Sequence, residues 1–270
     1  MIAENAQFGN NSESSDGTVD VTRDGHIAIV TINRPNKLNA MTLAMIRDFF
    51  SVTKELDDDP EIRSIVLTGA GERAFCAGGD LKQLLPAALD AGWDILNPDP
   101  TVRFLSNVFT PVVAAVRGLC VGAGFEILLG TDIRVAGHDS SFALAEATWG
   151  LIPGSGTNVR LPRQVPWAIA MDMLLTGQPV SAERAEQVGL INRVVDPDRV
   201  LETAVQIAQV IAINGPVAVR TAKEIAVRSA SLTDGFALEH ALNSRVLRSL
   251  DAHEGVSAFR DKRTPEFGNR

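Results

Sequence analysis

The chain has 270 residues, of which 45% are hydrophobic and 21% are charged, a balance typical of a globular protein with a sizeable core. Its formal net charge of −8 disfavours general binding to nucleic acid or to an anionic membrane. Only two cysteines occur, Cys76 and Cys120, without metal-ligand spacing. We therefore expect no nucleic-acid partner, no membrane partner, no disulfide framework and no metal site.

The first residues, 1–17, are polar and rich in Asn, Ser and Glu. They lack the basic start and apolar stretch of a signal peptide, and they lack the arginines of a transit peptide. We expect this segment to form a flexible tail, and we expect a cytoplasmic protein.

Two strands are expected next, at 19–22 and 27–32, joined as a hairpin across an Asp-Gly pair. A turn-rich loop follows at 33–40. A helix then begins after Thr42, which is a plausible N-cap, and its apolar residues recur at helical spacing. The acidic run before Pro60 ends it.

Strands and helices continue to alternate, which is the pattern of an α/β fold. Further strands are expected at 64–68, 112–116, 132–136 and 141–144, with a short helix at 122–129. From about residue 197 the pattern is helical without strands, and it predicts helices at 198–213, 217–230, 234–249 and 252–262. We therefore predict a flexible tail (1–17), an α/β core that holds the active site (18–196) and a helical C-terminal region (197–270).

Two glycine-rich turns are difficult to explain by packing alone. They are residues 74–82 (AFCAGGDLK) and 118–126 (GLCVGAGFE), and each precedes a predicted or possible helix. Small residues let the backbone approach a ligand closely, and a helix N-terminus offers free N–H groups to negative charge. Two such turns facing one another could hold a carbonyl oxygen that gains charge, although either turn alone is more often an ordinary connection.

Two glutamates lie in apolar segments close to these turns. Glu126 stands between Phe125 and Ile127, and Glu146 lies in the segment 142–149. A carboxylate in such surroundings must find a partner, shift its pKa or bear a large desolvation cost. One such glutamate is usually structural, whereas two beside glycine turns favour a general acid/base pair.

At these residues the sequence resembles the enoyl-CoA hydratase/isomerase (crotonase) superfamily, over about 19–267. The similar blocks, in chain order, are 33–40 (NRPNKLNA), 65–69 (IVLTG) with 74–82, 111–118 (PVVAAVRG), 122–126 (GAGFE), 131–136 (TDIRVA), Glu146 with 150–154 (GLIPG), and 175–195. The resemblance implies a spiral of ββα units, followed by C-terminal helices that help to build homotrimers or hexamers made of two trimers.

The resemblance also implies an acyl-CoA substrate whose thioester carbonyl is held by the backbone N–H groups of Gly79 and Ala123, an oxyanion hole. Glu126 and Glu146 match the two glutamates of the family's hydratases. The implied substrate- and CoA-binding residues are Lys37, Leu38, Ala77, Gly79, Asp80, Leu81, Lys82, Gly122 and Ala123. No cofactor is expected apart from the coenzyme A that belongs to the substrate.

The retained pair of glutamates favours an enoyl-CoA hydratase, or the reverse dehydration of a 3-hydroxyacyl-CoA. A Δ3,Δ2-enoyl-CoA isomerase, or another family enzyme such as a carnitinyl-CoA dehydratase, is the nearest alternative. A non-catalytic RNA-binding member is a more distant one, which the acidic charge disfavours. There are two departures from the family pattern: Ala123 replaces a common glycine but retains the backbone N–H, and the stretch 154–160 (GSGTNVR) bears on substrate identity. The acyl pocket is expected to be shaped by 83–100.

Overall fold

The fold was analysed in a computed structural model, which describes residues 17–84, 99, 101–149, 151–229 and 249–268. Its elements are β1 (Thr18–Asp24), β2 (Ile27–Asn33), η1 (Pro35–Lys37), α1 (Leu43–Asp58), β3 (Ser64–Gly69), β4 (Ala74–Cys76), β5 (Val112–Val116), β6 (Leu119–Val121), α3 (Ala123–Leu128), β7 (Ile133–Gly137), β8 (Ser141–Ala143), η3 (Ala145–Trp149), α4 (Thr157–Gln164), α5 (Trp167–Thr176), β9 (Val180–Ser181), α6 (Ala182–Gln187), β10 (Arg193–Val195), η4 (Pro197–Arg199), α7 (Val200–Ala212), α8 (Pro216–Arg228) and α10 (Leu250–Asp261).

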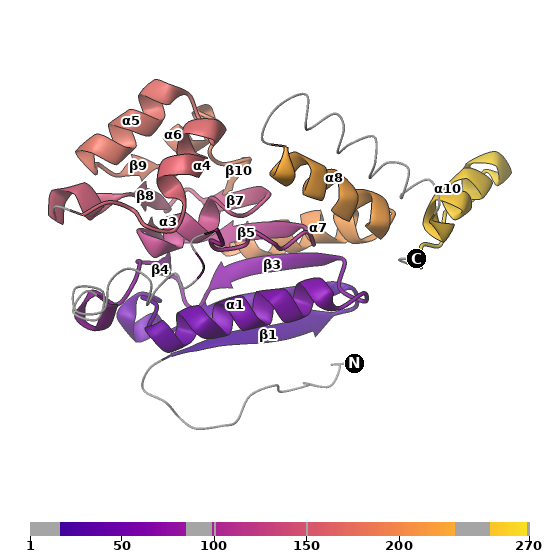
Figure 1. The fold of residues 1–270 in the computed structure, drawn as a ribbon, viewed down its shortest axis with the longest axis horizontal. Coiled ribbons are helices and arrows are strands. Elements are labelled where there is room, and N and C mark those ends of the chain that lie inside the picture. The colour runs from indigo at the N-terminus through magenta and orange to yellow at the C-terminus, as the bar shows by residue number, and fades with distance from the viewer. Residues whose placement is uncertain (1–16, 85–98, 100, 150, 230–248, 269–270) are drawn as a thin grey trace.

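The strands form two sheets. The larger has six strands in the order β1-β2-β3-β5-β7-β10, and the smaller has four in the order β4-β6-β8-β9. The pairs β1–β2 and β8–β9 are antiparallel, and the other pairs are parallel. Figure 1 shows these layers, with α1 across the front of the N-terminal strands and α4, α5 and α6 grouped at the upper left.

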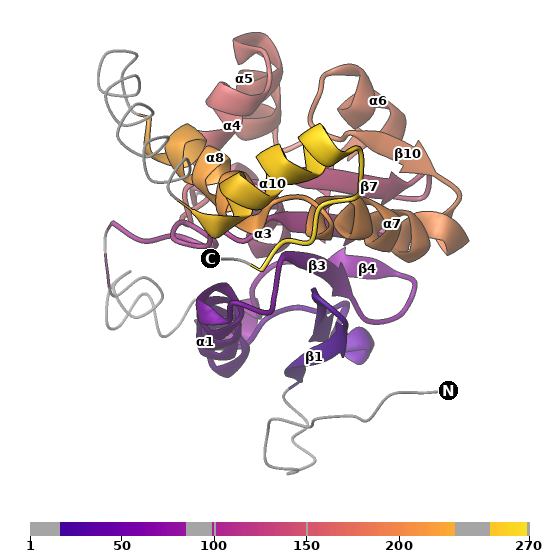
Figure 2. The same ribbon diagram turned by 90° about the vertical axis from the view of Figure 1, so that its right-hand side faces the viewer.

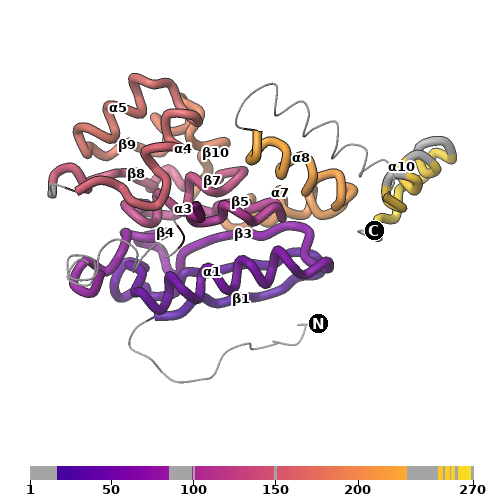
Figure 3. The backbone as a smooth tube through the Cα atoms, in the orientation of Figure 1, coloured from indigo at the N-terminus to yellow at the C-terminus, as the bar shows by residue number. Residues whose placement is uncertain are grey.

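The chain repeats one unit through the core. A strand of the large sheet is followed by a strand of the small sheet and then by a helical turn, as in β5, β6 and α3 and again in β7, β8 and η3. Each repeat adds one strand to both sheets, so the chain advances as a spiral of ββα units. The predicted α/β spiral of ββα units, with helices toward the C-terminus, is confirmed. Figure 3 traces this path from indigo β1 to yellow α10.

Helix α1 begins as expected from its sequence. The Thr42 hydroxyl accepts a hydrogen bond from the Met45 N–H at 3.2 Å and so caps the helix. Met45, Ile46 and Phe49 are buried and lie on one face, because residues three and four apart share a side of a helix. This face packs into the main hydrophobic core, which also includes Phe104.

Helix α7 covers the opposite face of the large sheet. Val200, Ala204 and Ala208 recur every four residues and pack with Val66 and Val113 of β3 and β5 in a second hydrophobic cluster. Strand β5, at the centre of the large sheet, is therefore buried on both faces, which is why all its residues are apolar. In Figure 2, α8 and α10 lie in front, and the two helices are in contact.

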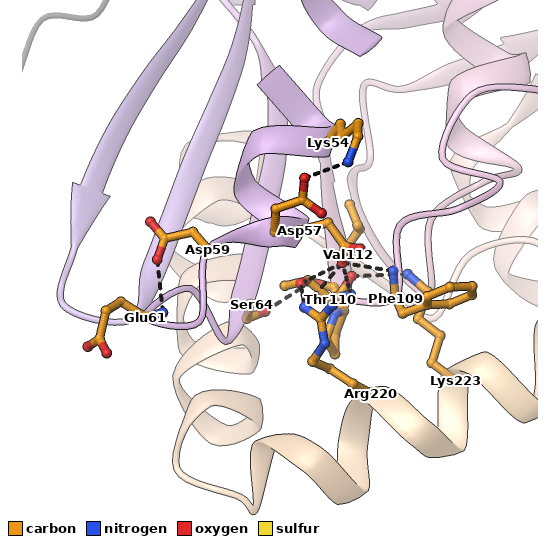
Figure 4. Close-up of polar contacts among 12 residues, drawn as sticks. Lys54, Asp57, Asp59, Glu61, Ser64, Phe109, Thr110, Val112, Arg220 and Lys223 are labelled. Carbon is orange, nitrogen blue, oxygen red and sulfur yellow. Dashed lines mark hydrogen bonds and ion pairs between the residues drawn. The ribbon is translucent and has the colours of Figure 1, made fainter. Parts of the chain in front are cut away.

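A polar cluster anchors α8 to the core (Figure 4). The Asp57 carboxylate, at the end of α1, accepts hydrogen bonds from the Thr110 N–H at 2.7 Å and the Thr110 hydroxyl at 2.8 Å, and Arg220 of α8 lies 3.2 Å from it. Lys223 forms an ion pair with Asp132 at 2.6 Å. Burial lowers the pKa of Lys223, and the neighbouring Asp132 opposes that shift.

The predicted helix at 234–249 and most of the predicted tail lie outside the described residues. Within the described part of the chain, no single helix is long and apolar enough to cross a membrane. Together, the helical segment 197–212 and α8 are long and apolar enough, but they meet at a bend of 107°. The part of this pair formed by α7 packs on the sheet.

Candidate active site

The first glycine turn joins β4 to a helical turn that starts at Leu81. Gly78 has φ of 106°, a conformation that favours glycine. Met41 runs alongside the turn, donating its N–H to the Gly78 carbonyl at 2.9 Å and accepting from the Asp80 N–H at 2.8 Å. Because Met41 pairs with the residues on either side of Gly79, the N–H of Gly79 points to the opposite side of the turn.

The second glycine turn joins β6 to α3 and lies against the first. Gly122 has φ of 54°, and a Cβ added there would lie 3.2 Å from Oε1 of Glu146. A Cβ added to Gly78 would lie 3.7 Å from the Ala123 nitrogen. A Cβ at Gly122 would therefore crowd the Glu146 carboxyl group, whereas at Gly78 it is the positive φ that favours glycine. Ala123 is the first residue of α3, so its N–H has no partner within the helix.

One cavity of about 830 Å³ brings the predicted catalytic residues together. Its wall includes Gly79 and Ala123 from the two turns, and Glu126 and Glu146. The other described lining residues are mainly apolar with a polar section: Ile46, Leu81, Leu84, Arg103, Phe104, Ser106, Leu151, Ile152, Pro153, Gly154, Ser155, Gly156, Asn158, Val159 and Arg160. The cavity is large enough for a small organic group, and its walls are those of a binding pocket.

Glu126 lies on α3, and its side chain is held rigidly. The residue is only 6% exposed, and its Oε1 accepts a hydrogen bond from the Ser155 N–H at 2.8 Å. Burial raises the pKa of this carboxyl group, whereas the donors of Ser155 and Gly154 and the positive charge of Arg103 oppose the rise.

Glu146 lies in η3 and lines the same cavity. Its Oε2 is buried and has no hydrogen-bond partner among the described residues. Burial raises the pKa of this carboxyl group too, and the charge of Glu126 raises it further, while the residue's own backbone N–H opposes the shift. The two carboxyl groups therefore interact, and Glu146 has fewer donors to stabilise its charged form.

The other predicted binding residues differ in whether they line the cavity. The backbone of Leu38 pairs with the first turn, since its carbonyl accepts from the Ala77 N–H at 3.0 Å. Leu81 lines the cavity and is exposed, whereas the lysines at 37 and 82 are exposed and do not line it. Asp80 forms a structural ion pair with Arg34 at 2.8 Å, which lowers the pKa of its carboxyl group.

Several lining residues were not singled out from the sequence. Ser155 holds Glu126, and it lies in the stretch 154–160, whose departure from the family pattern was the available signal. Arg103 and Ser106 lie in a loop without hydrophobic periodicity, so nothing in the local pattern placed them in the cavity. The predicted pocket segment 83–100 lies almost wholly outside the described residues.

The fold and the cavity together define an α/β protein of the ββα-spiral class. The chain matches the enoyl-CoA hydratase/isomerase family over residues 22–270. It is 40% identical to enoyl-CoA hydratase EchA19 of Mycobacterium tuberculosis, over 93% of this chain and 96% of the relative. It is 37% identical to a carnitinyl-CoA dehydratase of Proteus mirabilis, over 93% of this chain and 98% of that one.

Solved structures agree with these sequence matches. A crystal structure of an enoyl-CoA hydratase from Mycobacterium tuberculosis superposes with a TM-score of 0.84 at 37% identity, covering 93% of this chain and 99% of that one. One from Bacillus anthracis gives 0.84 at 32% identity, with the same coverage. The protein therefore belongs to the enoyl-CoA hydratase/isomerase (crotonase) family, as its sequence motifs predicted.

Proposed function

We propose that the protein is a hydro-lyase of the enoyl-CoA hydratase type, which adds water across the α,β double bond of an enoyl-CoA thioester or catalyses the reverse dehydration. The observation that carries the proposal is the presence of Glu126 and Glu146 in one cavity with Gly79 and Ala123. Relatives named enoyl-CoA hydratase and carnitinyl-CoA dehydratase support the same type of chemistry.

The surroundings of the two glutamates support different roles. Burial raises the pKa of both carboxyl groups, but Glu126 accepts hydrogen bonds from Ser155 and lies near the charge of Arg103, so we assign it the role of the base. Glu146 has a carboxylate neighbour and an oxygen without a partner in the described part of the chain, so we assign it the role of the acid. Glu126 then takes a proton from water as the water oxygen bonds to the β-carbon, and Glu146 gives its proton to the α-carbon.

The two turns would stabilise the negative charge that develops on the thioester oxygen. As water adds, electrons move from the double bond toward the thioester oxygen, which gains enolate character. The N–H groups of Gly79 and Ala123 would donate hydrogen bonds to that oxygen, and fixed backbone donors need no reorganisation as the charge develops. We propose that the exposed lysines at 37 and 82, with Leu38, Ala77, Asp80, Leu81 and Gly122, flank the CoA part of the substrate, and that no other cofactor is needed.

Substitution of each glutamate tests the proposal. Glu126→Gln and Glu146→Gln should each lower the turnover of an enoyl-CoA by roughly 10²–10⁴-fold, the usual contribution of general acid–base catalysis. CoA thioester binding, measured by calorimetry, should change little because neither side chain is proposed to hold the CoA part. Full activity in either folded variant would rule out a mechanism in which both glutamates act. Loss of activity in only one variant would favour the Δ3,Δ2-isomerase alternative, which needs a single carboxylate.

We also propose that the protein assembles as a homotrimer or as a hexamer of two trimers. Large apolar side chains are exposed on the helical layer, including Trp167 at 68% and Leu175 at 75%, both on α5. An apolar helix with such exposed residues is typical of an interaction surface.

A further inference from the structure

One loop, residues 101–111, forms part of the cavity wall. It contributes Arg103, Phe104 and Ser106 to the lining, and it leads directly into β5. The loop contains no regular helix or strand, and Leu105 in its middle has φ of 60°, a backbone conformation that residues other than glycine rarely adopt. Such a conformation persists only where the surroundings hold it, so the position of this wall depends on what the loop contacts.

The side of the loop that faces the cavity is held by α4 and α1. Arg160 of α4 donates hydrogen bonds to the Phe104 carbonyl at 2.8 Å and to the Ser106 hydroxyl at 3.1 Å. The Phe104 ring stacks on Phe50 of α1, with the ring centroids 5.2 Å apart. These contacts involve only the first half of the loop.

The second half of the loop is held by a buried polar cluster around Thr110 (Figure 4). Thr110 is fully buried. The Asp57 carboxylate of α1 accepts hydrogen bonds from the Phe109 and Thr110 N–H groups at 2.9 and 2.7 Å and from the Thr110 hydroxyl at 2.8 Å. Arg220 of α8 donates to the same hydroxyl, and Lys223 donates to the Thr110 carbonyl at 3.1 Å. Every polar atom of Thr110 therefore has a partner on α1 or α8.

Helix α8 contacts this half of the loop through three cations. Besides Arg220 and Lys223, the Arg228 guanidinium lies over the Phe109 ring, 5.0 Å from its centroid. The spacing of the three residues places them on one side of the helix. The support of the cavity wall therefore extends from α1 to α8, a helix of the C-terminal region.

Asp57 and Arg220 are the pair on which this support depends. Their side chains are 11% and 27% exposed, and they lie 3.2 Å apart. When one partner of such a pair is removed, the other keeps a poorly compensated charge and moves toward water or a new partner. Because Asp57 bonds Phe109 and Thr110 together, a shift of its carboxylate would displace the loop as well.

We propose that Asp57 and Arg220 are positioning residues for the cavity wall: they hold the loop 101–111 against the acyl group and so determine how well acyl groups longer than four carbons are accepted. This inference rests on the proposed hydratase function and names residues that set its specificity. Neither residue is among the described lining residues of the cavity, so both act through the loop. The two glutamates lie on α3 and η3, outside the loop.

A ratio of two substrates tests the effect on specificity. But-2-enoyl-CoA ends one carbon beyond the double bond, whereas dec-2-enoyl-CoA reaches further along the wall. Arg220→Met should lower the ratio of kcat/KM for the longer thioester to that for the shorter one by on the order of 10-fold, chiefly through KM. Arg220→Lys should retain part of the ratio, because the charge remains.

Arg23→Met is the matched control. Arg23 forms an ion pair with Asp59 at 2.8 Å, at the same end of α1 as Asp57, and this pair joins α1 to β1 instead of to the loop. Its loss removes the same kind of interaction from the same helix end. The substrate ratio of Arg23→Met should therefore equal that of the wild-type protein.

Hydrogen exchange followed by mass spectrometry tests the anchor without reference to activity. In Arg220→Met, the amides of 101–111 should exchange faster than in the wild-type protein, whereas those of α3 should keep their rates. A second pair of variants tests the same anchor from the loop. Thr110→Val keeps the shape but loses the hydroxyl and should act like Arg220→Met, whereas Thr110→Ser keeps the hydroxyl and should exchange like the wild-type protein.

The outcomes separate this inference from the proposed function. If folded Arg220→Met or Thr110→Val keeps the wild-type substrate ratio, the cluster only stabilises the fold, and the hydratase function stands. Faster exchange throughout the chain, instead of in the loop alone, would overturn the inference in the same way. If the wild-type protein hydrates neither thioester, the hydratase function fails, and the inference about specificity fails with it.

Discussion

The two glutamates of the cavity have the same chemistry but different surroundings. Glu126 is surrounded by donors from the segment 154–155, whereas Glu146 faces another carboxyl group and leaves one oxygen unpartnered within the described residues. Such a difference separates the proton affinities of two neighbouring carboxyl groups, and one can then act as base while the other acts as acid.

This difference predicts a bell-shaped dependence of kcat/KM on pH. Activity should rise as Glu126 loses its proton and fall as Glu146 loses its own. Burial raises the pKa of both groups, so both limbs should lie above the ordinary glutamate pKa of 4.5. The measurement is kcat/KM across the acid and alkaline range with one enoyl-CoA.

The Glu146→Gln variant provides the control for that profile. An amide has no proton to lose in this range, so the alkaline limb should disappear from its residual activity while the acid limb remains. An alkaline limb that persists in Glu146→Gln would assign it to another group and would contradict the proposed roles.

Sequence reasoning identified these glutamates because a charged residue in an apolar segment is unusual. It did not identify Arg103, because the position of that residue in the cavity depends on how the loop after 99 packs on Gly156. Contacts between segments distant in the sequence leave no local pattern.

At the scale of elements, the two turns carry the proposed oxyanion hole. Each turn uses a glycine with positive φ, and each lies within van der Waals distance of the other. The functional group is a backbone N–H, so the side chain at the donor position matters less than the path of the backbone. That explains why Ala123 can stand where many family members have glycine.

Two substitutions test this view. Ala123→Gly should keep most of the activity, because the N–H is retained. Gly79→Pro should be far less active, because proline has no N–H to donate, and loss of one such donor costs about 3–4 kcal/mol of transition-state stabilisation. The measurement is kcat on an enoyl-CoA.

The comparison requires a Gly79→Pro protein that is folded and binds free CoA, checked by circular dichroism and calorimetry. Wild-type hydration by such a protein would show that Gly79 is not the donor. A large loss in Ala123→Gly would show that the alanine side chain has a role of its own.

The longer elements were predictable, whereas several of the shortest were not. The helix that begins after Thr42 and the strands from 64 and 112 have enough residues to show their periodicity. Strands β4, β9 and β10 have three residues or fewer, which is too short for an alternating pattern. Their positions are set by pairing with distant strands, such as β4 with β6.

At the scale of the whole molecule, the order of strands is set by long-range pairing. The large sheet places β5 between β3 and β7, and this order follows from the spiral rather than from any single segment. The family resemblance implied that architecture, whereas composition and periodicity indicated only an α/β class. The predicted boundary near residue 197 stays a prediction, and α7 beyond it packs on the sheet.

The oligomeric state is a property of the whole molecule that can be measured in solution. Light scattering should give a mass of three or six times 28.9 kDa. Trp167→Glu, which places a charge in the exposed apolar surface of α5, should reduce that mass if the surface is part of the interface. A wild-type protein that remains a monomer at micromolar concentration would contradict the assembly proposal.

The most direct test of the account is the fate of water during turnover. A trans-2-enoyl-CoA incubated with the protein in ¹⁸O-labelled water should give a 3-hydroxyacyl-CoA with one labelled oxygen at the β-carbon, detected by mass spectrometry. The label should be absent from the product after the same incubation with a Glu126→Gln, Glu146→Gln double variant. Conversion of the substrate by the wild-type protein to an isomer without label would contradict the central claim that this site hydrates the double bond.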